Sequence, residues 1–231
     1  MNIRDLGVFA NAVYGATSAE VQAQAGRPVL RFVQAGGAAN GFQAAAFDCD
    51  QYTVIAFRGT AQAMDGIADV KLGAGMNSTY FSAGEEFVNF LPRQAGIVLC
   101  GHSLGGAIAQ VVANRTGWPM VTFNAPGVGV LASREILEAS PTMTAIRLGG
   151  MALSALRHPF QAVSDIRSAF NTVKGLNVCL QNDLVSAIGL HYGNVRRIPG
   201  TSANPLTEHR MTTMNTVLAN DPVGNIDVGT F

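Results

Sequence analysis

The sequence predicts an α/β fold built on a central, mostly parallel sheet with helices on both faces. From residue 85 onward, short apolar segments alternate with helix-like segments, an order that requires parallel strands joined by crossover helices. Before that point, apolar segments joined by short turns predict antiparallel hairpins. Hydrophobic residues make up 48% of the 231 positions and charged residues 13%, which is typical of one domain spanning residues 1–231 with a substantial core.

The N-terminal third reads as strands. The apolar segment Val29–Gln34 lies between Gly-Arg-Pro and a pair of glycines, which are turn residues. The segments Gly41–Cys49 and Tyr52–Phe57 flank the turn "DCDQ", a pattern that predicts a hairpin. A long Gly- and Ala-rich connection follows over Gly59–Gly84, and connections of this length are usually functional.

The alternating pattern of strands and helices occupies the middle of the chain. We expect helices at Glu85–Gln94 and Leu104–Thr116, the second ending at Gly117, and strands at Ile97–Cys100, Pro119–Phe123 and Asn177–Leu180.

A partly helical insert is expected at about residues 133–175. Its apolar residues after Pro159 recur at steps of three or four, which predicts a helix that packs on the sheet, with a lid or a membrane-docking helix as the alternative. These residues are Phe160, Val163, Ile166, Phe170 and Val173.

Composition excludes several classes of function. Fifteen basic and fifteen acidic side chains cancel, so nothing favours nucleic acid as a partner. Cys49, Cys100 and Cys179 are widely spaced without metal-ligand spacing, which predicts buried free thiols, with one disulfide and one free thiol as the alternative. We expect no metal and no cofactor. Asp5 and Asn11 interrupt the first apolar run, and no stretch has the length of a membrane span. We therefore expect a cytoplasmic chain or one exported by a leaderless route.

The segment Gly101-His102-Ser103-Leu104-Gly105 matches the pattern G-x-S-x-G between an apolar strand and a helix. This is the sequence of a nucleophile elbow, in which a serine hydroxyl projects from a tight, strained strand-to-helix turn. The flanking glycines remove side chains that would collide with the neighbouring strand or helix. An ordinary helix N-cap is the alternative role of Ser103, but a cap needs neither glycine. We expect Ser103 to be a nucleophile.

A serine nucleophile needs a histidine base, and four histidines are available. In α/β hydrolases the three catalytic residues follow in the order Ser, Asp or Glu, His. His209 satisfies this order and lies in the polar loop "PLTEHRM" before a helix-like segment. His102 is expected to point away from Ser103, His158 lies in the insert without a strand end before it, and His191 is expected to be a structural hydrogen-bonder.

Asp183 is the acid that best fits the same order. It follows the strand-like segment "NVCLQ", so it emerges where catalytic groups gather in parallel sheets. Asp165 lies on the polar face of the expected helix in the insert, and Asp221 and Asp227 come after His209.

Two donors are expected to form an oxyanion hole, and Thr60 could supply its backbone N–H and its hydroxyl. One is the N–H of Leu104, the residue after the nucleophile. The other is expected from Thr60, because the buried strand in "VIAFRGT" runs directly into this turn. A plain turn is the alternative, and the neighbouring G-x-S-x-G motif favours the functional role.

With these residues in place, the chain resembles the class 3, fungal-type lipases of the α/β-hydrolase superfamily, and in particular their bacterial members. The resemblance covers about Thr53–Val128 and Asn177–Met214. It rests on "VIAFRGT", "MDGIADV" with Asp65 and Asp69, "GHSLGGAIA", "VTFNAPGVG" where many members read F-G-A-P, "NDLVSAIGLHYGNV" and "EHRM".

The chain departs from that family in two places. The segment after "FRGT" is short and Gly-rich, without an obvious amphipathic lid helix, and the insert at about 133–175 does not match the family motifs.

The resemblance implies hydrolysis of carboxylic ester bonds in acylglycerols or phospholipids at a lipid surface, through an acyl-enzyme. A leaderless chain of this kind could be a secreted antibacterial lipase effector that travels with a neutralising immunity protein. Two alternatives stay open: a soluble short-chain carboxylesterase or thioesterase, and a hydrolase fold used as a binding module with an idle triad.

Overall fold

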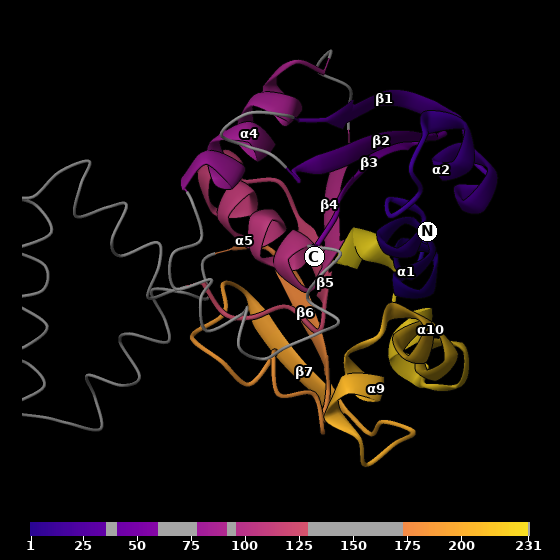
Figure 1. Cartoon of the computed structure of the whole chain (residues 1–231), viewed down its shortest axis with the longest axis vertical. Helices are drawn as coiled ribbons and strands as arrows, with labels where there is room; N and C mark the ends of the chain where they lie inside the picture. Colours follow the sequence, from indigo (N-terminus) through magenta and orange to yellow (C-terminus); the bar gives the residue numbers. More distant parts are fainter. Residues whose placement is uncertain (36–40, 60–77, 92–95, 129–172, 231) are drawn as a thin grey trace, which may run out of the picture.

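The computed structural model describes residues 1–35, 41–59, 78–91, 96–128 and 173–230, and within them one mixed sheet dominates. Its strands lie side by side in chain order (Figure 1). They are β1 (Val29–Gln34), β2 (Gln43–Cys49), β3 (Tyr52–Phe57), β4 (Ile97–His102), β5 (Met120–Phe123), β6 (Gly175–Leu180) and β7 (Asn194–Ile198).

The sheet changes from antiparallel to parallel at β3. β1 pairs with β2 and β2 with β3 in antiparallel fashion, whereas β3 to β7 are all parallel. Phe57 lies opposite Gly101, and His102 lies opposite Phe123, so the carboxyl ends of β3, β4 and β5 meet at one edge. The predicted hairpin and the mostly parallel sheet are both confirmed.

Two helices pack against one face of the sheet, α4 (Ser78–Asn89) and α5 (Leu104–Thr116). Phe57, Leu99 and Ile108 lie in the buried cluster between these helices and the strands. α5 has the predicted bounds, and Gly117 ends it in a left-handed conformation at φ 76°. α4 begins seven residues before the predicted Glu85.

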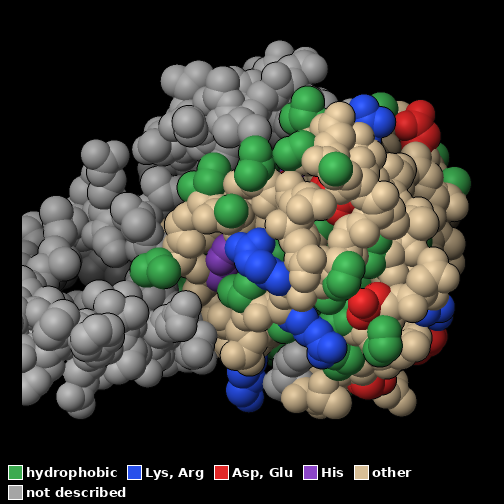
Figure 2. Space-filling model, turned by 90° about the horizontal axis from the view of Figure 1, so that it is seen from below, with side chains coloured by type: hydrophobic (Ala, Val, Ile, Leu, Met, Phe, Trp, Pro, Cys, Tyr) green, Lys and Arg blue, Asp and Glu red, His purple; other side chains and the backbone are tan. Residues whose placement is uncertain are grey.

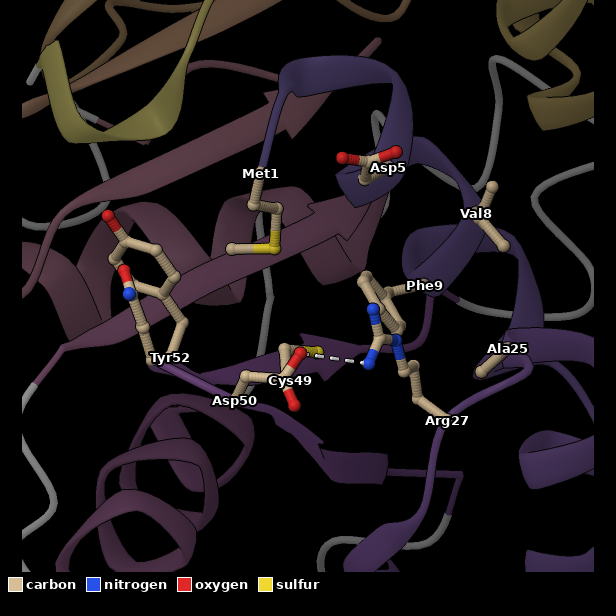
Figure 3. A pocket seen from close by; sticks show the side chains of 10 residues that line it. Met1, Asp5, Val8, Phe9, Ala25, Arg27, Cys49, Asp50 and Tyr52 are labelled. Atoms are coloured by element: carbon tan, nitrogen blue, oxygen red, sulfur yellow. Dashed lines mark hydrogen bonds and ion pairs between the residues drawn. The ribbon is translucent and has the colours of Figure 1, made fainter.

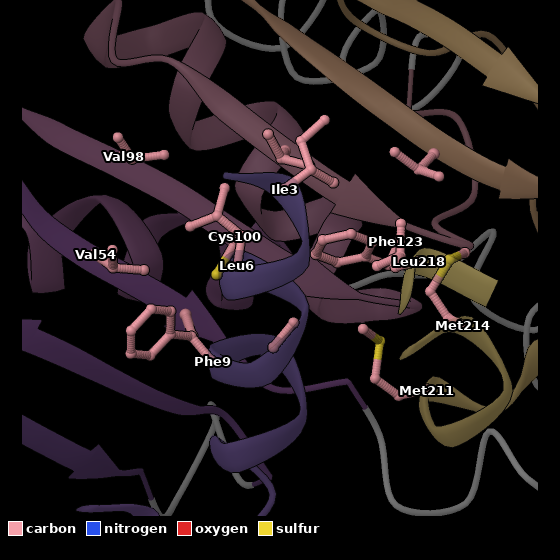
Figure 4. Close-up of a cluster of buried hydrophobic side chains, with 14 of the residues drawn as sticks. Ile3, Leu6, Phe9, Val54, Val98, Cys100, Phe123, Met211, Met214 and Leu218 are labelled. Atoms are coloured by element: carbon pink, nitrogen blue, oxygen red, sulfur yellow. The ribbon is translucent and has the colours of Figure 1, made fainter. Parts of the chain in front are cut away.

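The opposite face is covered by α1 (Ile3–Ala12) and α10 (Met211–Asn220), so helices lie on both faces as predicted (Figure 1). Ile3, Leu6 and Phe9 of α1 point into a core that Phe123 and Met214 also line (Figure 4).

The expectation that the N-terminal third consists of strands was wrong for its first 25 residues. These form α1 and α2 (Ser18–Ala25), and only β1 to β3 are strands. Asn2 and Asp5 make a reciprocal capping box at the start of α1, and Thr17 caps α2. The helical spacing of the apolar residues of α1 was the signal that could have predicted it.

The C-terminal part of the chain adds three short elements. Two 3₁₀ turns, η4 (Pro222–Asn225) and η5 (Val228–Thr230), follow α10, and the short helix α9 (Pro205–His209) precedes it. The insert expected at about 133–175 lies outside the described residues, apart from its last three positions. Among the helices that the structure describes, none has the length and apolar character needed to cross a membrane.

The start of α5 lies against the ends of β3 and β4 at a distance that only glycine permits. A Cβ atom on Gly105 would collide with the backbone carbonyl of Phe57, and one on Gly101 would collide with the backbone of Gly105. The two glycines therefore let three backbone segments meet around Ser103, as the sequence motif predicts.

We predict that Gly105→Ala lowers the free energy of unfolding by about 3 kcal/mol, because the backbone of Phe57 cannot yield to the added methyl group. Urea denaturation measures the change. Gly229→Ala is the matched control, since its nearest neighbours are side-chain atoms at 3.0 and 3.4 Å. Equal stability of Gly105→Ala and the control would contradict the steric argument.

Candidate active site

Ser103 occupies the turn between β4 and α5 in a strained backbone conformation. Its φ of 55° and ψ of −128° lie outside the regions that residues with a side chain ordinarily adopt. Its N–H donates to the carbonyl of Phe123 at 3.1 Å, which ties the turn to the end of β5. The side chain makes no capping hydrogen bond with α5, so Ser103 is not an ordinary N-cap.

The structure brings Ser103, His209 and Asp183 together in one chain of hydrogen bonds. His209 Nε2 lies 2.9 Å from Ser103 Oγ, and His209 Nδ1 lies 2.8 Å from Asp183 Oδ1. Because a carboxylate can only accept, Nδ1 carries the proton and Nε2 is left to accept the hydrogen of the Ser103 hydroxyl. The three residues are only 1%, 5% and 1% exposed, respectively, so solvent barely competes for these bonds.

Asp183 lies three residues after the end of β6 and is held by the turn that follows the strand. Its Oδ2 accepts the N–H of Ser186 at 2.8 Å, and its Oδ1 accepts the N–H of Val185 at 3.4 Å. Burial alone would raise the pKa of Asp183, but the hydrogen bonds and charge of His209 and the hydrogen bonds of Ser186 together hold this pKa below its ordinary value. The carboxylate is therefore ionised at neutral pH beside the imidazole.

The residues predicted for the oxyanion hole are only partly described. Leu104 is the first residue of α5, where backbone N–H groups have no acceptor within the helix. Thr60 lies outside the described residues. Gly59, just before it, lies next to Ser103, since a Cβ atom there would be 3.3 Å from the Cβ of Ser103. The described part of the "FRGT" segment, up to Gly59, therefore approaches Ser103.

Sequence reasoning missed the role of His102 and Tyr14 in this site. His102 Nε2 donates to the backbone carbonyl of His209 at 2.6 Å, and its Nδ1 accepts the hydroxyl of Tyr14 at 3.0 Å. The Tyr14 oxygen in turn accepts the N–H of Gly59 at 3.2 Å. His102 is thus directed at the backbone of His209 and not at the hydroxyl of Ser103.

The charge state of His102 follows from its surroundings. Burial and the nearby charge of His209 lower the pKa of His102 to about 3, so its ring is neutral at physiological pH. Its centroid lies 4.9 Å from that of the His209 ring. Burial likewise raises the pKa of Tyr14 to about 12, which keeps the hydroxyl a donor.

The remaining candidates have other surroundings. His191 is a structural hydrogen-bonder as predicted, because its Nε2 donates to the carbonyl of Ala125 at 2.9 Å. Asp221 caps the 3₁₀ turn η4, and Asp227 interacts with the amino group of Met1. The predictions for Asp65, Asp69, His158 and Asp165 fall outside the described residues.

The three cysteines are free thiols. Cys100 and Cys179 are buried, as predicted, and Cys49 is half-buried. Burial raises the pKa of both Cys49 and Cys179 to about 11, so these thiols are not ionised nucleophiles. Across the described parts of the chain, no group of three or more His, Cys, Asp or Glu side chains could hold a metal ion.

Exposed leucines lie on the two segments that carry Asp183 and His209. Leu184 and Leu190 belong to the connection between β6 and β7, and Leu206 belongs to α9; each is 39% exposed or more. Figure 2 views the molecule from the end where α9 lies in Figure 1, and hydrophobic side chains there surround a few Lys and Arg side chains.

A separate hollow of about 480 Å³ lies at the other end of the strands (Figure 3). It is bordered by Arg27, Cys49 and Asp50, with Tyr52 at the start of β3. Since Phe57 and Gly59 at the far end of β3 lead to Ser103, this hollow does not belong to the candidate site.

Two sequence relatives resemble parts of the chain. A stretch of 93 residues is 36% identical to the extracellular phospholipase A1 of Serratia liquefaciens and covers 39% of this chain but 29% of that protein. A stretch of 65 residues is 42% identical to the putative lipase ATG15 of Eremothecium gossypii and covers 27% of this chain and 12% of that protein. The matched stretches thus span less than a third of these relatives.

Solved structures and one family match the chain over more of its length. The triacylglyceride lipase of Rhizomucor miehei is 15% identical with a TM-score of 0.45, covering 96% of this chain and 90% of that chain. A triacylglycerol lipase from Penicillium expansum is 14% identical, also with a TM-score of 0.45, covering 87% and 80%. The Tle-like phospholipase domain family matches residues 10–203. Because this match takes in most of the 231 residues, the chain belongs to the Tle-like phospholipase family.

Proposed function

We propose that the protein hydrolyses carboxylic ester bonds of lipids with Ser103 as nucleophile, His209 as general base and Asp183 as the residue that orients the base. The observation that carries this proposal is the chain of hydrogen bonds of 2.9 and 2.8 Å from the strained serine through the imidazole to the carboxylate. Nucleophile, base and orienting acid in this geometry are the parts that acyl transfer requires.

In the first step His209 Nε2 takes the hydroxyl proton as Ser103 Oγ attacks the ester carbonyl. Asp183 keeps the imidazole in the required tautomer and stabilises the imidazolium that forms. The carbonyl oxygen becomes an oxyanion, which the N–H of Leu104 and a donor from Thr60 receive. Collapse of the tetrahedral intermediate expels the alcohol, which takes the proton from His209 and leaves the acyl group on Ser103.

In the second step a water molecule enters the site that the alcohol has left and hydrolyses the acyl-enzyme. His209 removes a proton from the water as it attacks the acyl carbonyl, and the same donors receive the second oxyanion. The proton then returns to Ser103 Oγ as the fatty acid leaves.

We propose acylglycerols or phospholipids as the substrate class. The support comes from the exposed Leu184, Leu190 and Leu206 on the segments that carry the acid and the base, since apolar side chains there can contact acyl chains. The Serratia relative is named a phospholipase A1. A series of esters of increasing chain length separates this substrate class from a short-chain carboxylesterase or thioesterase.

We further propose that the protein acts on membranes outside its producing cell, as an antibacterial effector whose producer carries a neutralising protein. The name of the Serratia relative, which describes it as extracellular, favours this setting. We expect the chain directed to the periplasm of a test bacterium to lyse it, and Ser103→Ala to be harmless there. Growth at the wild-type rate with the active chain in the periplasm would contradict the effector role.

We predict that Ser103→Ala lowers kcat for phospholipid and p-nitrophenyl ester hydrolysis by roughly 10⁶-fold, because the hydroxyl that would form the acyl-enzyme is removed. Release of fatty acid is the measurement. Ser82→Ala, on the exposed surface of α4, is the matched control and should keep full activity. A fluorophosphonate probe should label the wild-type chain and spare Ser103→Ala; lack of labelling in the wild type would favour an idle hydrolase fold.

We predict that the protein loses stability at acid pH because His102 is neutral in the folded chain. Its pKa is about 3 in the folded chain against 6.5 for an ordinary histidine, so between these values the unfolded chain binds more protons. Its contribution to stability is therefore present above about pH 6.5 and is lost as pH falls toward about 3. His102→Gln keeps a donor and an acceptor but does not titrate.

Urea denaturation at several pH values measures this effect. We expect the stability of His102→Gln to fall less steeply than that of the wild type between pH 7 and about pH 4.5. Parallel curves for the two proteins would show that His102 does not stay neutral in the folded chain.

A further inference from the structure

Asn124, the residue after β5, has an unusual backbone and a fully buried side chain. Its φ is 45°, in the left-handed region that glycine enters freely and that asparagine enters more readily than most other residues. Its exposed fraction is 0%. A buried amide carries two donors and an acceptor, so its hydrogen bonds indicate why it occupies this position.

The Asn124 amide joins two segments that are distant in the sequence. Nδ2 donates to the backbone carbonyl of Glu208 at 2.8 Å, and Oδ1 accepts the backbone N–H of Leu180 at 2.9 Å. Because a carbonyl can only accept and an N–H can only donate, the two partners fix which way the amide faces. One side chain thus connects the end of β6 to the residue before His209.

The carbonyls of Glu208 and His209 are therefore both held by side chains from strand ends. Asn124 binds the first of them from the end of β5, and His102 binds the second from the end of β4. Ser103 follows β4 directly, and its N–H is tied to the end of β5 through Phe123. The nucleophile and the backbone of the histidine base are consequently attached to the same two strands.

We propose that Asn124 is a positioning residue for His209: by holding the carbonyl of Glu208 it keeps the imidazole within hydrogen-bond reach of Ser103. The inference rests on the proposed function, in which His209 is the base. The Glu208 side chain does not replace this anchor, because its Oε1 accepts the N–H groups of Thr201 and Ser202 on the preceding loop. Without Asn124 the peptide before His209 loses its bond to the sheet.

Displacement of His209 affects the chemical step more than substrate binding. Asn124 is fully buried and contacts backbone groups, so its loss leaves the exposed surface unchanged. A shift of about 1 Å in a reacting group costs up to roughly 100-fold in rate. Loss of Asn124 should therefore lower kcat and leave KM nearly unchanged.

The test is Asn124→Gly, which removes the amide and accepts a φ of 45° without strain. We expect kcat for a p-nitrophenyl ester to fall about 10- to 100-fold while KM stays within about twofold. Thermal unfolding of the same sample shows whether the variant is folded at the assay temperature. A kcat within twofold of the wild type would overturn the inference.

Asp50→Gly is the matched control. Asp50 also has a positive φ, of 61°, but lies in the turn between β2 and β3, where its side chain makes an exposed ion pair with Arg27. Such a surface pair contributes little stability, so kcat should stay at the wild-type value. An equal fall of kcat in Asp50→Gly would show that loosening of the backbone anywhere is enough, and would overturn the inference.

A second variant covers the case in which Asn124→Gly does not fold. Asn124→Asp keeps the shape and the acceptor for Leu180, but its carboxylate has no hydrogen to donate to Glu208 at pH 8. It should also lose kcat at nearly constant KM, and full activity would overturn the inference. Failure of the proposed function is distinguishable, because Ser103→Ala would then retain the wild-type activity.

Discussion

The close approach of α5 to the ends of β3 and β4 is the constraint on which the site depends. Gly105 lies so near the carbonyl of Phe57 that a single methyl group would separate the helix from the sheet. Ser103 lies in the strained turn beside this contact, and its side chain makes no capping hydrogen bond with α5, whose first N–H groups have no acceptor within the helix. Local strain at Ser103 is maintained because the sheet and the helix on both sides of it are rigid.

The base and the acid reach this turn by contacts that connect distant parts of the chain. His209 follows Ser103 by more than 100 residues, and its placement depends on backbone bonds to His102 and Asn124 at neighbouring strand ends. Parallel pairing aligns the ends of β4, β5 and β6, so one edge of the sheet supplies the proposed nucleophile, these anchors and Asp183. The sheet therefore acts as the common frame for all three residues.

Whether a site residue can be predicted from the sequence depends on how far along the chain its partners lie. Ser103 and its glycines are predictable because the residues of the elbow are five consecutive residues with a recognisable pattern, and the chain order then limits the choice of Asp183 and His209. His102 and Asn124 were not predictable, since their partners lie 107 and 84 residues away and no local pattern records them. The helix α1 is a different case, because the helical spacing of its apolar residues is a local signal that predicts it.

The neutral state of His102 matters for a base that becomes charged during the proposed reaction. The two imidazole rings lie 4.9 Å apart, and a charge on both would be strongly unfavourable in a buried site. Burial keeps His102 neutral, so the positive charge that forms on His209 faces only Asp183 as a close ionised partner among the described residues. The hydrogen bond from Tyr14 to His102 Nδ1 requires the proton of His102 on Nε2, where it binds the carbonyl of His209. A histidine that stays neutral thus anchors the histidine that takes up the proton in the proposed reaction.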